Sequence, residues 1–69
     1  MEMLKINGNE KQFPSGMPRT LTELLEQLSI NQATVVAEID GRIIERQNFA
    51  QTTLASGQNI ELIRFVGGG

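Results

Sequence analysis

One segment of the chain has the spacing of an amphipathic helix, and segments with the spacing of strands flank it on both sides. Its apolar residues recur at i, i+3, i+4 and i+7, and they are Leu21, Leu24, Leu25 and Leu28. This spacing puts the four side chains in one stripe. Thr20 and Glu23 stand at the spacing of a capping box, in which hydroxyl and carboxylate each accept from a free backbone N–H. The pattern predicts one helix that begins near Thr20 and lies with its leucine stripe on a sheet.

The segment before this helix has the pattern of a β-hairpin. Leu4 and Ile6 alternate with Met3, Lys5 and Asn7, which is the period of a strand with one buried face. Asn7-Gly8 is a strong hairpin-turn signal and leads into a second strand over residues 10–13. Two prolines and a glycine between residues 14 and 18 then interrupt regular structure before the helix.

The segment after the helix predicts three further strands. Residues 34–39 are β-branched and end in the turn pair Asp40-Gly41, which leads into a short strand at Ile43-Ile44. Residues 48–56 are polar, with Phe49 and Leu54 as single apolar anchors. Gly57 turns the chain into a last strand over residues 59–66.

This order of elements predicts an α+β fold of the β-grasp, or ubiquitin-like, type. A mixed sheet of about four to five strands would carry one main helix across it. The first and last strands would lie side by side in the sheet centre, and residues 1–66 would form a single domain with 67–69 as a flexible tail. The leucine stripe should face six residues of the sheet: Leu4, Ile6, Val35, Ile39, Ile60 and Leu62.

Composition excludes most kinds of self-contained chemistry. The chain has 69 residues, enough for one small domain, and a formal net charge of −2. It has no cysteine and no histidine, so thiol nucleophiles, thiolate metal sites and the commonest general base near neutral pH are missing. We therefore predict a protein that is not an enzyme and holds no metal or cofactor.

Charge and hydropathy also bear on partners and location. The six Lys and Arg residues are scattered, whereas nucleic-acid binding needs a concentrated basic surface. The amino-terminal residues lack the pattern of a signal peptide, and no apolar run approaches about 18 residues. We expect a soluble, cytoplasmic protein that binds neither nucleic acid nor a membrane.

The strongest functional signal is the run Gly67, Gly68 and Gly69 directly after apolar residues 62–66. Glycines without Cβ cannot pack a core, but they form a thin peptide that can enter a narrow channel. Glycine-rich termini are commonly disordered or are remnants of expression tags. The strand pattern here continues into Gly67 without the Ser, His or Lys of such tags. We interpret the run as a functional tail that places the carbonyl carbon of Gly69 beside a nucleotide phosphate or a thiol.

The last strand predicts a contact surface next to this tail. Alternation puts Ile60, Leu62 and Val66 on the inner face and exposes Ile63 and Phe65 on the outer one. Exposed apolar side chains often mark an interface, although Phe65 would also fit a role in covering a neighbour. Arg64 fits either attraction to acidic partners or an ordinary solvated side chain.

Three segments together resemble one family. Residues 57–69, with the ending Phe-Val-Gly-Gly-Gly, together with Asn7-Gly8 and residues 36–41, are similar to the ThiS family of sulfur carrier proteins of thiamin biosynthesis. The resemblance covers the whole chain. Gly-Gly alone is typical of a wider group that includes ubiquitin and the small subunit of molybdopterin synthase, whereas Phe-Val before three glycines favours the ThiS family. Gln58 departs from the aspartate that is common there, at a turn position without a functional role.

The resemblance implies a mechanism in which other enzymes act on Gly69. The E1-like enzyme ThiF would use ATP to convert its carboxylate into an acyl-adenylate, and sulfur delivered by a persulfide would displace AMP. The thiocarboxylate would then donate sulfur to the thiazole synthase ThiG, with Gly67 and Gly68 threading the partner's channel. Ile63, Arg64 and Phe65 would form the partner interface.

Three other functions stay open at this stage. One is the small subunit of molybdopterin synthase, which usually has a longer chain. Another is a modifier joined to lysine through Gly69, as ubiquitin is. The third is a β-grasp binding module in which the glycines are incidental.

Overall fold

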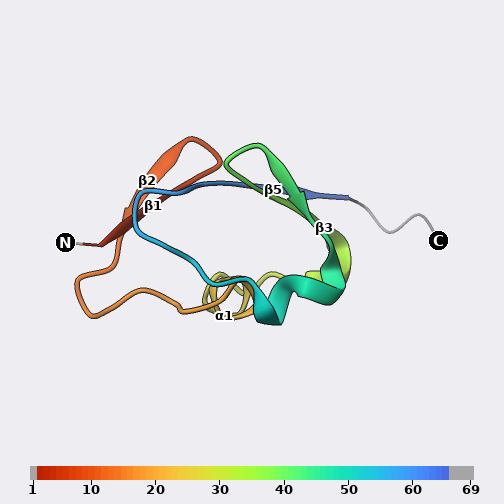
Figure 1. Cartoon of the computed structure of the whole chain (residues 1–69), viewed down its shortest axis with the longest axis horizontal. Helices are drawn as coiled ribbons and strands as arrows, with labels where there is room; N and C mark the ends of the chain where they lie inside the picture. The colour runs from red at the N-terminus through yellow and green to blue at the C-terminus, as the bar shows by residue number, and fades with distance from the viewer. Residues whose placement is uncertain (1, 66–69) are drawn as a thin grey trace.

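The computed structural model describes residues 2–65, which form a five-stranded sheet with one α-helix (Figure 1). The order of the strands in the sheet is β2-β1-β5-β3-β4. The elements in chain order are β1 (Met3–Ile6), β2 (Asn9–Gln12), α1 (Leu21–Gln27), the 3-10 helix η1 (Gln32–Thr34), β3 (Val35–Ile39), β4 (Arg42–Ile44), the 3-10 helix η2 (Arg46–Gln51) and β5 (Asn59–Arg64). Figure 1 shows α1 and η2 on the same side of the sheet. The predicted β-grasp architecture is confirmed.

The sheet is mixed because one of its pairings is parallel. The hairpins β1–β2 and β3–β4 are antiparallel, and β3 pairs with β5 antiparallel, whereas β1 runs parallel to β5. The first and last strands are therefore neighbours in the middle of the sheet, as predicted. The turns that close the hairpins have Asn7 and Asp40 at φ 51°, each followed by a glycine at φ 85°. Such left-handed conformations favour Asn-Gly and Asp-Gly pairs.

Side-chain and backbone hydrogen bonds fix both ends of α1. Thr20 is the N-cap, and its Oγ1 accepts from the N–H of Glu23 at 3.3 Å. The carboxylate of Glu23 accepts from the N–H of Arg19 at 2.9 Å, one residue earlier than in the standard capping box. At the other end, Ser29 has φ 58° and the N–H of Ile30 donates to Leu25 O at 2.9 Å. This is a Schellman ending, which satisfies carbonyls that the helix leaves free.

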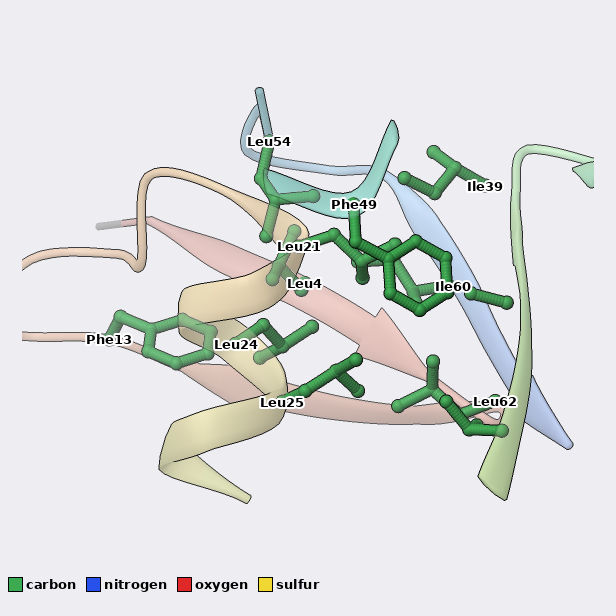
Figure 2. Close-up of a cluster of buried hydrophobic side chains, with 12 residues drawn as sticks. Leu4, Phe13, Leu21, Leu24, Leu25, Ile39, Phe49, Leu54, Ile60 and Leu62 are labelled. Atoms are coloured by element: carbon green, nitrogen blue, oxygen red, sulfur yellow. The ribbon is translucent and has the colours of Figure 1, made fainter. Parts of the chain in front are cut away.

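The core lies between α1 and the inner face of the sheet (Figure 2). Leu24 and Leu25 are 0% and 1% exposed, as expected for the middle of the leucine stripe. The buried cluster consists of Leu4, Phe13, Leu21, Leu24, Leu25, Val35, Ala37, Ile39, Phe49, Leu54, Ile60 and Leu62. Leu28 and Ile6 pack against this cluster but are only partly buried. The predicted contact between stripe and sheet is confirmed.

Small differences from the predicted elements occur where short helices replace strand or loop. Thr34 ends η1 rather than starting a strand, because the Asn31 side chain accepts from Ala33 N–H and turns the chain there. Residues 46–51 form η2, and its Phe49 is buried in the core. The last strand ends at Arg64 rather than at Val66. Val66, predicted for the inner face, and the predicted tail 67–69 lie outside the described residues.

Candidate functional site: the outer face of the central strand

β5 is held on both sides along the first part of its length. On one side Lys5 and Ile6 are the register partners of Asn59 and Ile60. On the other side β3 pairs with β5 along the whole length of β3, from the pair Ile39 and Ile60 to the pair Val35 and Arg64. The backbone N–H of Phe65 also donates to Thr34 O at 3.0 Å, so attachment to the sheet continues one residue past the strand. The segment leading to the glycines therefore leaves from a central, well-anchored strand.

The two faces of β5 differ sharply in exposure. Ile60 and Leu62 are 0% and 6% exposed and belong to the core. Ile63 and Phe65 are 52% and 44% exposed and lie on the opposite face. The predicted exposure of these two side chains is confirmed, and Phe65 is not a core residue. Their role as an interface stays a prediction.

Two further apolar side chains extend this exposed surface. Val36 is the register partner of Ile63 on β3, and it is 38% exposed. Ile43 on β4 is the register partner of Glu38 and is 68% exposed. We call Val36, Ile43, Ile63 and Phe65 the outer apolar face. Sequence reasoning missed its first two members, although strict alternation along residues 34–39 already favours an outward Val36.

Two carboxylates lie on the same side of the sheet as the outer apolar face. Glu38 and Glu61 are register partners on β3 and β5, and Glu38 also faces Ile43 across the hairpin. Like charges directly opposite each other on one face of a sheet oppose folding. The face thus combines negative charge with exposed apolar area, and the apolar area is the feature that often marks an interaction site.

The other predicted site residues differ in what the structure can say of them. Arg64 is exposed at the end of β5, as expected both for a residue that attracts acidic partners and for an ordinary solvated side chain. Gly67, Gly68 and Gly69 lie outside the described residues. Within residues 2–65, no group of three or more acidic, histidine or cysteine side chains could hold a metal ion. No helix in the same part of the chain is both long and apolar enough to cross a membrane.

The arrangement of one helix on a mixed sheet, with parallel first and last strands at the centre, defines the class of protein as β-grasp. Comparison with known proteins then gives the family. The model of the ThiS family matches residues 2–69, which includes the three glycines. The chain belongs to the ThiS family, as the resemblance in its motifs implies.

Individual relatives agree with this assignment. The sulfur carrier protein ThiS of Escherichia coli is 32% identical over 66 residues, which cover 96% of this chain and 100% of the relative. A thiazole synthase of Paramagnetospirillum magneticum is 33% identical over 66 residues, which cover 96% of this chain. The chain spans only 20% of the length of that synthase.

Solved structures show the same fold. The crystal structure of the thiamine biosynthesis protein ThiS from Geobacter metallireducens has a TM-score of 0.81 at 35% identity, covering 97% of this chain and 99% of that one. The solution structure of a thiamine biosynthesis protein from the same organism has a TM-score of 0.78 at 36% identity, covering 100% of this chain and 88% of that one. Both matches extend over nearly the whole fold rather than over an isolated motif.

Proposed function

We propose that this chain carries sulfur for thiamin biosynthesis as a thiocarboxylate on Gly69. As a member of the ThiS family it is a sulfur carrier protein of that pathway. The observation that carries the proposal is the family match over residues 2–69, because it includes the glycines as well as the fold. The position of β5 at the sheet centre supports it, since that strand leads directly toward them.

The chemistry proceeds by activation of a carboxylate. A carboxylate is a poor electrophile, so the oxygen of Gly69 first attacks the α-phosphate of ATP, and pyrophosphate leaves. The terminal sulfur of a persulfide then attacks the acyl carbon, and AMP leaves. Cleavage of the remaining S–S bond by a thiol releases the thiocarboxylate, whose sulfur is nucleophilic. This sulfur is the atom donated to the thiazole.

Partner enzymes supply the catalytic groups in this proposal. An E1-like enzyme of the ThiF type binds ATP, a persulfide donor brings the sulfur, and thiazole synthase ThiG accepts it. The similarity to a thiazole synthase over the length of this chain supports the last partner. The chain itself acts as a co-substrate and not as an enzyme. The thiol that releases the thiocarboxylate must stay reduced, and the cytoplasm, where thiols are kept reduced, is the location we propose.

The outer apolar face is the proposed contact with the activating enzyme. It is continuous with the end of β5, so a partner that receives the glycines in a channel also covers Ile63 and Phe65 beside its entrance. Arg64 lies between them in the sequence and is exposed, but alternation along β5 directs its side chain to the opposite side of the strand, so it would supply a cation at the strand end and not on the outer apolar face. An aromatic side chain near the centre of such a contact typically contributes more to binding than its neighbours.

Changes of tail length test the proposal. Removing Gly69, or adding one residue after it, displaces the reacting carbon, and transfer chemistry tolerates little displacement. We expect both variants to lose pyrophosphate release with the E1-like enzyme and ATP while their unfolding midpoints match that of the parent chain. Release at the parent rate by either variant would contradict the role of Gly69.

A substitution at Gly68 tests the width and backbone freedom of the tail. Valine adds two methyl groups and disfavours positive φ, so Gly68→Val should slow activation strongly but less completely than loss of Gly69. Gly68→Ala is the matched control, because it adds one methyl group only, and it should fall between valine and the parent. A large loss of stability in Gly68→Val would instead mean that the glycines are packed structure.

A further inference from the structure

The backbone ladder between β1 and β5 is short and stops before β5 does. Its last rung is the N–H of Asn7 donating to Ile60 O at 2.8 Å. The chain then turns away, with Asn7 at φ 51° and Gly8 at φ 85°. The next backbone groups of β5 on this side belong to Leu62, and β1 has no backbone left to offer them.

The side chain of Asn7 takes the place of the missing strand. Its Oδ1 accepts from the N–H of Leu62 at 2.7 Å, and its Nδ2 donates to Leu62 O at 3.3 Å. A carboxamide has one acceptor oxygen and a donor nitrogen, so it can pair with both polar groups of one residue as a peptide unit does. Asn7 therefore adds a rung to the ladder from a position that otherwise serves only as a turn.

The site of this rung matters because Leu62 is the last buried residue of β5. Ile60 and Leu62 lie in the core, whereas the following Ile63, Arg64 and Phe65 are exposed. Both bonds to the carboxamide are partly buried, which shields them from competition with water. The carboxamide thus holds β5 at the boundary between the packed strand and the segment that leads to Gly67.

The second hairpin offers an internal comparison. Asp40 has the same φ of 51° and is likewise followed by a glycine at φ 85°. Its Oδ1 accepts from the N–H of Asn59 at 2.9 Å, and its own N–H donates to Asn59 O at 2.8 Å. Asp40 therefore fixes the beginning of β5 and Asn7 fixes the part nearest the tail. A carboxylate is sufficient at the first place, whereas the second uses a side chain that also donates.

We propose that Asn7 is a positioning residue for the transfer chemistry, setting the direction in which β5 leaves the sheet toward Gly69. This inference rests on the proposed function. Without the carboxamide, β5 is held on only one side from Leu62 onward, by β3. The reacting carbon then spends less time in the productive position, and transfer rates are sensitive to displacements of about 1 Å. The effect falls on the rate of the bound complex rather than on binding.

The test compares Asn7→Gly with Asp40→Gly. Glycine accepts the positive φ of both turns, so each variant deletes side-chain bonds to β5 without straining its hairpin. Steady-state adenylation by the E1-like enzyme with ATP should show kcat lowered about tenfold in Asn7→Gly, with KM nearly unchanged. Asp40→Gly should keep the kcat of the parent, even where both variants lose similar stability.

Hydrogen exchange provides a readout that does not depend on activity. In Asn7→Gly the amide of Leu62 should exchange about tenfold faster, because it loses its acceptor. Asp40→Gly should show the same effect at Asn59 and leave Leu62 unchanged. Asn7→Asp retains an acceptor for the Leu62 N–H and should recover part of both its protection and the kcat.

The outcomes separate this inference from the function on which it rests. If the parent chain is adenylated and Asn7→Gly matches Asp40→Gly in kcat, the inference is overturned and the proposed function stands. If Asn7→Asp behaves like Asn7→Gly in both measurements, the bond to the Leu62 amide is not the cause and the inference also fails. A parent chain that is not adenylated overturns the proposed function first, and the inference with it.

Discussion

The two faces of β5 hold apolar side chains of similar size in opposite surroundings. Ile60 and Leu62 are enclosed by α1 and the inner face of the sheet, while Ile63 and Phe65 remain 52% and 44% exposed. Burial on one face already fixes the register of the strand, so folding does not require apolar residues on its outer face. The inner residues stabilise the domain, whereas the outer ones stay exposed, where the proposed partner would cover them.

The largest effect should come from a pair of adjacent truncations on the two faces. Leu62→Ala removes buried atoms and leaves a cavity, which should cost ~2–5 kcal/mol and largely unfold so small a domain. Ile63→Ala is its matched control on the next residue and should cost less than about 1 kcal/mol. Urea unfolding of both variants measures the contrast. Equal losses would mean that the outer face is also part of the stabilising structure.

Leu24 and Leu25 extend this comparison to the helix that covers the inner face. Truncation of either to alanine should cost ~2–5 kcal/mol, because both are almost fully buried in the middle of α1. Glu26→Ala, on the exposed side of the same helix, is the control and should leave the unfolding midpoint nearly unchanged. A stable Leu24→Ala or Leu25→Ala variant would contradict the account of the core.

Truncation of Phe65 should have a smaller effect, and it should weaken partner binding more than folding. Phe65→Ala should weaken binding to the activating enzyme or the thiazole synthase by ~1–3 kcal/mol. Its cost in folding free energy should be smaller than that, because the side chain is 44% exposed. Calorimetric titration and unfolding of the same variant decide whether Phe65 is an interface residue or only covers a neighbouring side chain. An unfolded variant, or a folded one that binds with the affinity of the parent chain, would defeat its place in the interface.

The smallest effect concerns Val36, the least exposed member of the outer apolar face. Val36→Ala removes part of a cross-strand contact with Ile63 and a little contact area, so both folding and partner affinity should change by less than about 1 kcal/mol. The same assays apply. A loss of affinity larger than that of Phe65→Ala would move the centre of the interface from the end of β5 to β3.

Most of the fold follows from local patterns in the sequence. The leucine spacing, the Thr20 cap and the two turn pairs at Asn7 and Asp40 are set by residues close together along the chain, and each element occurs where they indicate. The glycine ending and the motif before it are also local signals, and they were sufficient to indicate the family that the comparisons show.

The parts that sequence reasoning missed depend on strand register. Val36 joins the outer apolar face beside Ile63 because β3 pairs with β5 in this register, and Ile43 joins it because β4 pairs it with Glu38 of β3. The second role of Asn7 depends on Leu62, a residue 55 positions away. An Asn-Gly pair indicates a turn, but nothing near it shows which strand its side chain meets.

The intact mass of the chain after reaction shows whether Gly69 takes up sulfur. The parent chain is incubated with the E1-like enzyme, ATP and a persulfide sulfur source, and a variant lacking Gly69 is treated in parallel. We expect the parent to gain the mass difference between one sulfur and one oxygen atom, localised to Gly69 by fragmentation, and the variant to keep its mass. An unchanged parent mass, or covalent conjugates to lysine of other proteins in its place, would contradict a sulfur carrier that works through Gly69.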